Sequence, residues 1–134
     1  MQLIDTNVLG ELMRPAPNVG VRRWLDASAA AGASLAVSVV TIDEVVYGLT
    51  RRPRGPSFAL FDKLVAGSTV LVVSEAIARR GGELRALQSL RGQLRSQPDM
   101  LIAATAQVHA LTLVTRNMRD FEGCGIAVLD PFDA

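Results

Sequence analysis

The sequence predicts a single α/β domain over residues 1–134, with a central parallel sheet of about five strands and helices on both of its faces. Two observations support this fold class. Short apolar runs alternate along the chain with longer segments whose apolar residues recur at helical spacing. Nearly every short run is apolar throughout, which is typical of parallel strands that are buried on both sides.

Each predicted strand is a run of aliphatic and β-branched residues that stops at a polar residue, glycine or proline. The first run ends abruptly at Asp5, and a helix-like pattern begins directly after Asn7. The strands are predicted at residues 1–4, 35–40, 70–73, 111–115 and 126–129.

The helices are predicted between capping residues and the glycines or prolines that end them. Thr41 is the predicted cap after the second strand, and Asp99 opens the helix that follows Pro98. Two glycine sites, Gly81-Gly82 and Gly92, weaken the longest helix. The helices are predicted at residues 8–13, 19–31, 42–50, 57–66, 75–94 and 100–110, with a turn at 116–121.

Composition excludes several classes of protein. Cys124 is the only cysteine, so an internal disulfide is impossible, which fits a reducing cytoplasm. No apolar stretch has the length of a membrane span, and the first residues do not resemble a signal peptide. The net charge of +1 does not by itself indicate a nucleic-acid-binding protein, although 13 of the 14 basic residues are arginines.

Four acidic residues are placed differently from the others. Asp5, Glu44 and Asp120 each follow a predicted strand, and Asp99 opens an almost wholly apolar helix. Because the carboxyl ends of parallel strands meet at one edge of a sheet, these side chains are expected to lie together. Each one alone is explained equally well as a helix cap, a helix-dipole partner or a turn residue. Their coincidence at one edge favours a site.

Clustered carboxylates repel one another unless a cation neutralises them. Mg²⁺ takes oxygen ligands and binds through few carboxylates, so the cluster predicts a divalent-metal site. Spacing alone does not decide whether Asp43 or Glu44 faces this site. Neutral polar residues flank the acids and are predicted to orient them, namely Thr6, Asn7, Thr115 and Asn117.

The chain resembles the PIN-domain ribonucleases, specifically the VapC-like toxins of toxin–antitoxin pairs, including their FitB-like branch. The matching segments occur in family order and cover essentially the whole chain. One departure is Gly10, where the FitB-like branch often has a small hydroxyl residue. The matching segments are residues 3–9, 11–15, 41–49, 99–106 and 115–121.

This resemblance implies a metal-dependent endoribonuclease that a small VapB-like antitoxin neutralises and that forms a homodimer. It implies a catalytic quartet of Asp5, Glu44, Asp99 and Asp120, and thereby favours Glu44 over Asp43. The expected cofactor is Mg²⁺ or Mn²⁺, held by Asp5, Asp99 and Asp120. Glu44 either completes a second metal position or orients the attacking water.

Arginines beside the site motifs are candidates for contacts to RNA or to an antitoxin: Arg14, Arg116 and Arg119. The basic turn at residues 51–56 is a second candidate, and solvated surface arginines are the simpler explanation of any one of them. The apolar faces of residues 42–49 and 58–65 either pack together or accept a partner helix. Two other functions remain open, a catalytically idle PIN-like module that binds nucleic acid or protein, and a small-molecule hydrolase.

Overall fold

The computed structural model describes residues 1–132, and the last two residues of the predicted domain, 133 and 134, lie outside this range. Five parallel strands form one sheet, as predicted. The strands are β1 (Gln2–Ile4), β2 (Leu35–Ser38), β3 (Thr69–Leu71), β4 (Thr112–Val114) and β5 (Val128–Leu129). The helices are α1 (Thr6–Leu12), α2 (Val19–Ala30), α3 (Val39–Arg51), α4 (Ser57–Ala66), α5 (Glu75–Leu90), α6 (Gln97–Val108) and the 3₁₀ helix η1 (Met118–Phe121).

The sheet has the strand order β3-β2-β1-β4-β5, so β1 lies at its centre. Leu3 pairs with Ala36 of β2 on one side and with Leu113 of β4 on the other. A central strand with two parallel neighbours brings the loops that follow β1, β2 and β4 to the same edge. That edge carries the residues of the candidate site.

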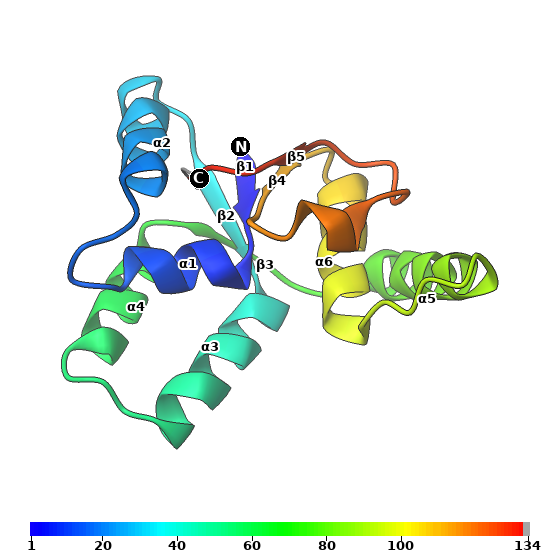
Figure 1. Ribbon diagram of the computed structural model, residues 1–134, viewed down its shortest axis with the longest axis horizontal. Coiled ribbons are helices and arrows are strands. Elements are labelled where there is room, and N and C mark those ends of the chain that lie inside the picture. The colour runs from blue at the N-terminus through cyan, green and yellow to red at the C-terminus, as the bar shows by residue number, and fades with distance from the viewer. Residues whose placement is uncertain (133–134) are drawn as a thin grey trace.

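Helices cover both faces of the sheet, which confirms the predicted fold class (Figure 1). On one face, α1 to α4 bury an apolar core that includes Val8, Val45 and Phe61. On the other, α5 and α6 bury a second core that includes Ile77 and Ile102. Val45 of α3 and Phe61 of α4 belong to the same core, whereas other apolar residues of the two helices stay exposed, among them Val46 and Phe58.

The second strand ends earlier than predicted. Val39 and Val40 are β-branched, but they form the first turn of α3 because the Ser38 side chain accepts a hydrogen bond from the Val40 N–H. Thr41 is therefore not a helix cap, and it is completely buried. Glu44 lies beyond the first turn of α3.

The boundaries around α5 and α6 also differ from the prediction. α5 ends at Leu90, and Gly92 adopts a φ of +78°, a conformation that glycine tolerates and that does not continue a helix. Pro98 does not precede α6 but lies in its first turn, where its missing N–H costs nothing. Ser96 is the cap instead of Asp99.

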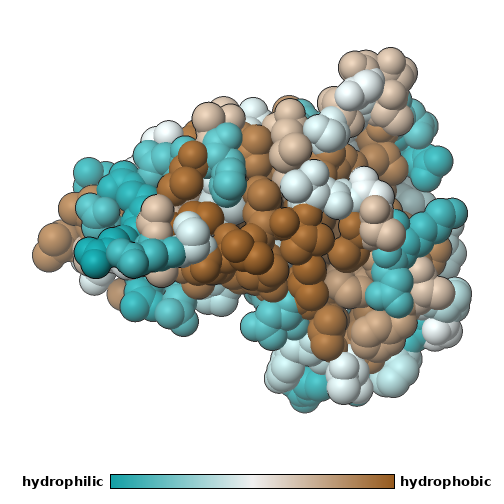
Figure 2. Space-filling view, turned by 180° about the vertical axis from the view of Figure 1, so that it is seen from behind, coloured by the Kyte–Doolittle hydropathy of each residue, from teal (hydrophilic) through white to brown (hydrophobic). Residues whose placement is uncertain are grey.

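The face opposite to that of Figure 1 carries a broad band of apolar residues (Figure 2). Exposed apolar side chains also occur at the edge of the sheet, where Val70 of β3 is 41% and Val72, directly after β3, is 65% accessible. Strands β3 and β5 are shorter than predicted. No helix in residues 1–132 is long and apolar enough to cross a membrane.

Candidate active site

Asp5 lies at the carboxyl end of the central strand and is almost completely buried. One carboxylate oxygen accepts a hydrogen bond from the Thr6 N–H at 2.8 Å, so Asp5 is the cap of α1. The other oxygen accepts hydrogen bonds from the Thr115 hydroxyl at 2.8 Å and the Asn7 side chain at 3.2 Å. The sequence left a choice between a cap and a site residue, and the structure shows that one carboxylate has the geometry of both.

The charge of Asp5 is held in an unfavourable place. Burial raises the pKa of this carboxyl above its ordinary value, and the nearby Glu44 raises it further. Hydrogen bonds from Thr115, Thr6 and Asn7 lower the pKa but do not cancel the effect of burial. A buried carboxylate that lies near a second carboxylate and is fixed by hydrogen bonds has the properties of a cation ligand.

Glu44, rather than Asp43, faces the site. The Thr6 hydroxyl donates a hydrogen bond of 2.7 Å to Glu44 Oε1, whereas Asp43 is exposed. The buried Thr41 hydroxyl lies 3.3 Å from the Thr6 hydroxyl. Thr6 therefore links the first turn of α1 to the Glu44 carboxylate on α3.

Asp99 lies in the first turn of α6, where the Ser96 side chain accepts a hydrogen bond from the backbone N–H of Asp99. Burial raises the pKa of the Asp99 carboxyl, and the negative charges of Asp5 and Asp120 act in the same direction. A hydrogen bond with Ser96 and the charge of Arg95 oppose these effects. The carboxylates of Asp5 and Asp120 are therefore near enough to Asp99 for their charges to act on it.

Asp120 lies on η1 and is half-exposed. Its Oδ1 atom lies 3.7 Å from Nη1 of Arg95, a residue of the loop between α5 and α6. The Arg95 side chain is only 11% exposed, against 45% for that of Asp120. Asp120 is therefore held by a partly buried cation instead of by hydroxyl and amide groups.

The four predicted supporting residues take different parts. Thr115 is buried, donates to Asp5 and accepts hydrogen bonds from the Asn7 side chain and the Asn117 N–H, at 3.1 and 3.0 Å. Asn7 also accepts the Arg116 N–H at 3.0 Å, which ties α1 to the segment after β4. Asn117 contributes through its backbone, and its side chain is exposed at the rim.

The predicted contact arginines also differ in their surroundings. Arg14 follows α1, and its side chain lies 3.5 Å from the carboxylate of Glu11. The guanidinium of Arg116 stacks over the ring of Phe132, 4.7 Å from its centroid. Arg119 is exposed on η1, directly before Asp120.

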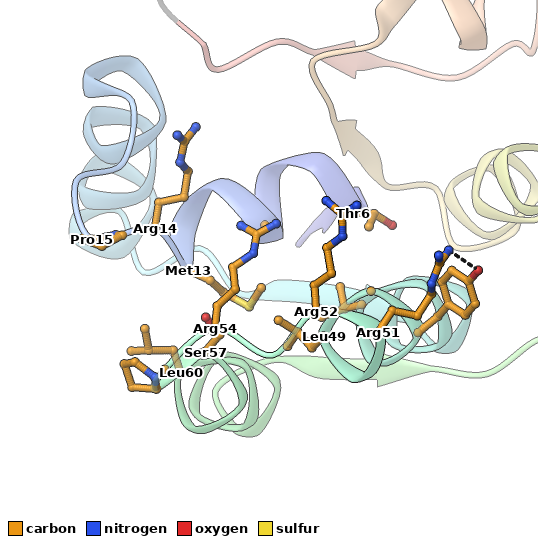
Figure 3. A pocket seen from close by; sticks show the side chains of 16 residues that line it. Thr6, Met13, Arg14, Pro15, Leu49, Arg51, Arg52, Arg54, Ser57 and Leu60 are labelled. Atoms are coloured by element: carbon orange, nitrogen blue, oxygen red, sulfur yellow. Dashed lines mark hydrogen bonds between the residues drawn. The ribbon is translucent and has the colours of Figure 1, made fainter.

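A groove of about 880 Å³ lies between α1, α3 and α4 and begins at Thr6. Its walls include the apolar side chains of Met13, Leu49 and Leu60. In Figure 3, Arg52 and Arg54 extend from the turn between α3 and α4 toward α1. The groove thus combines an apolar floor, formed by these side chains, with a positively charged rim. Through Thr6, which donates to Glu44, it adjoins the acidic cluster.

The donor set suits a hard divalent cation, because Asp5, Glu44, Asp99 and Asp120 offer carboxylate oxygens and two of them have raised pKa values. Burial of this charge without a counter-ion is unfavourable, so a cation would relieve it. Over residues 1–132, however, no three His, Cys, Asp or Glu side chains are close enough together to hold a metal ion as they stand. The ligands fit the metal in chemistry, and binding requires at least one of them to rotate.

Comparison with known proteins agrees with the sequence resemblance. The model of the PIN domain matches residues 3–123, so the chain belongs to the PIN-domain family. The chain is 31% identical over 98% of its length to the toxin FitB of Neisseria gonorrhoeae, covering 99% of that protein. It is 35% identical over 90% of its length to the ribonuclease VapC10 of Mycobacterium tuberculosis, covering 86% of it.

A solved toxin–antitoxin complex from Klebsiella pneumoniae contains a chain of the same fold, with a TM-score of 0.75 and 28% identity. The match covers 100% of both chains. The predicted membership in this toxin family is therefore supported by sequence and by fold.

The sequence did not predict the structural roles of three residues near the site. Thr41 was predicted as a cap, and Arg95 is not among the predicted site residues. Ser96 is not among them either, although Ser96-Gln97-Pro98-Asp99 has a capping residue followed three positions later by an acid. That spacing was a usable signal, whereas nothing in the sequence shows that Arg95 reaches Asp120.

Proposed function

We propose that this protein is a metal-dependent endoribonuclease and the toxin of a toxin–antitoxin pair. The observation that carries the proposal is the convergence of four acidic side chains on one edge of a PIN-domain sheet. Ribonuclease activity is supported by the 35% identity to VapC10, named as a ribonuclease. The reaction is hydrolysis of a phosphodiester bond in RNA.

Asp5, Asp99 and Asp120 are the residues that would hold Mg²⁺ or Mn²⁺. The chemistry that such an ion supplies is activation of water near neutral pH and neutralisation of charge at the scissile phosphate. Asp5 is the fixed member of the set, because three donors hold its carboxylate. Thr115 and Asn7 both donate to Asp5 Oδ2 and thereby orient the carboxylate.

Glu44 takes one of two parts. It either binds a second metal ion or orients the attacking water. In both cases the hydrogen bond from the Thr6 hydroxyl fixes the position of the Glu44 carboxylate. The two alternatives differ in stoichiometry. Titration with Mn²⁺ distinguishes them, because a second site gives two bound ions per chain and its loss in Glu44→Gln gives one.

The arginines supply the attraction that the acidic cluster lacks. RNA is repelled by four carboxylates until a cation neutralises them, and basic residues at the rim offset this repulsion. Arg116 and Arg119 lie on the segment between Thr115 and Asp120, and Arg14 lines the groove that begins at Thr6. These three residues, together with Arg52 and Arg54, are the proposed phosphate contacts.

The proposed partner is a cognate VapB-like antitoxin, supported by the likeness to a chain of a toxin–antitoxin complex. The groove between α1, α3 and α4 has the apolar floor and basic rim that suit a peptide with aliphatic and acidic side chains. A reducing cytoplasm, where RNA and such a partner occur, is the proposed location. The homodimer implied by the family resemblance remains a prediction.

The proposal is tested by incubating the purified protein with RNA, with Mg²⁺ or Mn²⁺ and with a chelator, alongside Asp5→Asn and Asp99→Asn. Cleavage by the wild type that requires metal and is lost in both variants supports it. An unreactive wild-type protein that still binds RNA indicates the idle binding module instead. Cleavage that both variants retain shows that the acidic cluster is not the active site.

A further inference from the structure

Arg95 is a cation in an unusual place. Its side chain is only 11% exposed, and within residues 1–132 its buried Nε atom has no hydrogen-bond partner. The arginines of other ion pairs are more accessible, from Arg80 at 32% to Arg79 at 78%. A guanidinium removed from water and incompletely hydrogen-bonded is costly, so some compensating interaction must hold it there.

The compensation comes from the acidic cluster. Nη1 of Arg95 lies 3.7 Å from Oδ1 of Asp120, and its charge also acts on the Asp99 carboxyl. The 3.7 Å separation is longer than a charge-assisted hydrogen bond, which is about 2.7–2.9 Å. Arg95 is therefore held by attraction to the group of carboxylates and not by a tight bidentate pair with one of them.

A divalent cation and this guanidinium have the same partners. Asp99 and Asp120 are two of the three carboxylates proposed to hold the metal, and Asp120 is directed toward Arg95. Two cations that share ligands repel one another in a partly buried site. A metal ion held by Asp120 and Asp99 would therefore lie close to the positive charge of Arg95.

We propose that Arg95 is an internal counter-ion of the acidic cluster, which stabilises the apoprotein and competes with the divalent metal for Asp120 and Asp99. This inference rests on the proposed metal-dependent function. It assigns to Arg95 a positioning role that sets how much metal is needed to assemble the site.

The test is calorimetric titration of Mn²⁺ into the wild type, Arg95→Met, Arg95→Lys and Arg85→Met. Arg85 is an exposed arginine of α5, so its substitution removes the same charge away from the cluster. Arg95→Met is expected to bind Mn²⁺ roughly tenfold more tightly or better. Arg95→Lys, which keeps the charge, and Arg85→Met are expected to bind close to the wild type.

Thermal melting gives a second readout. The apoprotein of Arg95→Met is expected to melt at a lower temperature than the wild-type apoprotein, because the carboxylates lose their counter-ion. Saturating Mn²⁺ is expected to raise the melting temperature of Arg95→Met by more than it raises that of the wild type. If this variant does not melt cooperatively, Arg95→Gln, which is neutral but can form hydrogen bonds, carries the same expectations.

The wild type itself offers a third readout. The Nε–H signal of Arg95, assigned by its loss in Arg95→Lys, is expected to shift in the nitrogen–proton NMR spectrum when Mg²⁺ saturates the site. The signal of Arg85 is expected to stay in place. An unmoved Arg95 signal in the presence of bound Mg²⁺ would overturn the inference.

The other outcomes are also decisive. Unchanged or weaker Mn²⁺ binding in Arg95→Met contradicts the competition and leaves the proposed function standing. Weaker RNA binding with unchanged metal affinity makes Arg95 a phosphate contact instead. A folded wild type and Arg95→Met that both fail to bind Mn²⁺ contradict the metal-dependent function and the inference together.

Discussion

Asp5 and Asp120 belong to the same acidic cluster, but the protein holds them in opposite ways. Asp5 ends the central strand, is buried and accepts hydrogen bonds from Thr6, Asn7 and Thr115. Asp120 lies on a 3₁₀ helix, is 45% exposed and faces a cation at 3.7 Å. The difference separates a rigid part of the site, built with the sheet, from an adjustable part that can respond to a bound ion.

Asp5→Asn is expected to have the largest effect on activity and a small effect on stability. Cleavage should fall to background because the rigid carboxylate is lost, while the free energy of unfolding of the apoprotein stays the same or rises by roughly 1 kcal/mol. The rise is expected because the substitution removes a buried charge from a repelling cluster. Activity assays and urea denaturation in chelator test both parts, and a marked loss of stability would show that capping of α1 is the main role.

Glu44→Gln and Asp43→Asn form a matched pair on α3. The first removes the charge that Thr6 holds in the site and is expected to lower kcat about 100-fold or more. The second changes an exposed residue and is expected to leave kcat near that of the wild type. Equal effects of the two substitutions would contradict the assignment of Glu44 to the site.

Thr115→Val and Asn117→Ala separate the supporting residues. Loss of the Thr115 hydroxyl removes the shorter of the two hydrogen bonds to Asp5 Oδ2 and is expected to lower metal affinity or kcat by about 10- to 100-fold. Asn117 supports the site through its backbone, so its side chain is expected to be dispensable. Thr115→Ser, which keeps the hydroxyl, should restore most of the activity, and a failure to do so would indicate that packing matters more.

Ser96→Ala tests the position of Asp99. Loss of the cap of α6 is expected to lower the free energy of unfolding by about 1 kcal/mol. Urea denaturation measures this change. Activity is expected to fall less than in Thr115→Val, because Asp99 keeps its place in the first turn of the helix.

The pH dependence of stability is expected to be the smallest effect. Asp5 and Asp99 have raised pKa values in the folded chain, so the folded protein binds protons more readily than the unfolded one. The apoprotein should therefore lose stability as the pH rises from about 4 through the raised pKa values, and then remain level. Denaturation in chelator at several pH values measures this loss, which Asp5→Asn should reduce; the same slope in both proteins would show that other groups are responsible.

Much of the fold and of the acid quartet was predictable, because both depend on local patterns. Apolar runs mark the parallel strands, and the ends of those runs placed Asp5 and Asp120 at one edge. The start of α3 was not predictable from propensity, since Val39 and Val40 favour strands and only the Ser38 cap and the packing of α3 make them helical. The approach of Arg95 to Asp120 depends on how two loops pack, which no sequence spacing encodes.

The contacts of Asp5 also determine when the site can form during synthesis of the chain. The Asp5 N–H bonds to the carbonyl of Val114, and its carboxylate bonds to Thr115, 110 positions further along the chain. Pairing of such distant positions closes a long loop of chain, which slows folding. A nascent chain on the ribosome therefore lacks the active site until residues 112–120 have been synthesised and have joined the sheet. This order of assembly delays activity until almost all of the domain exists.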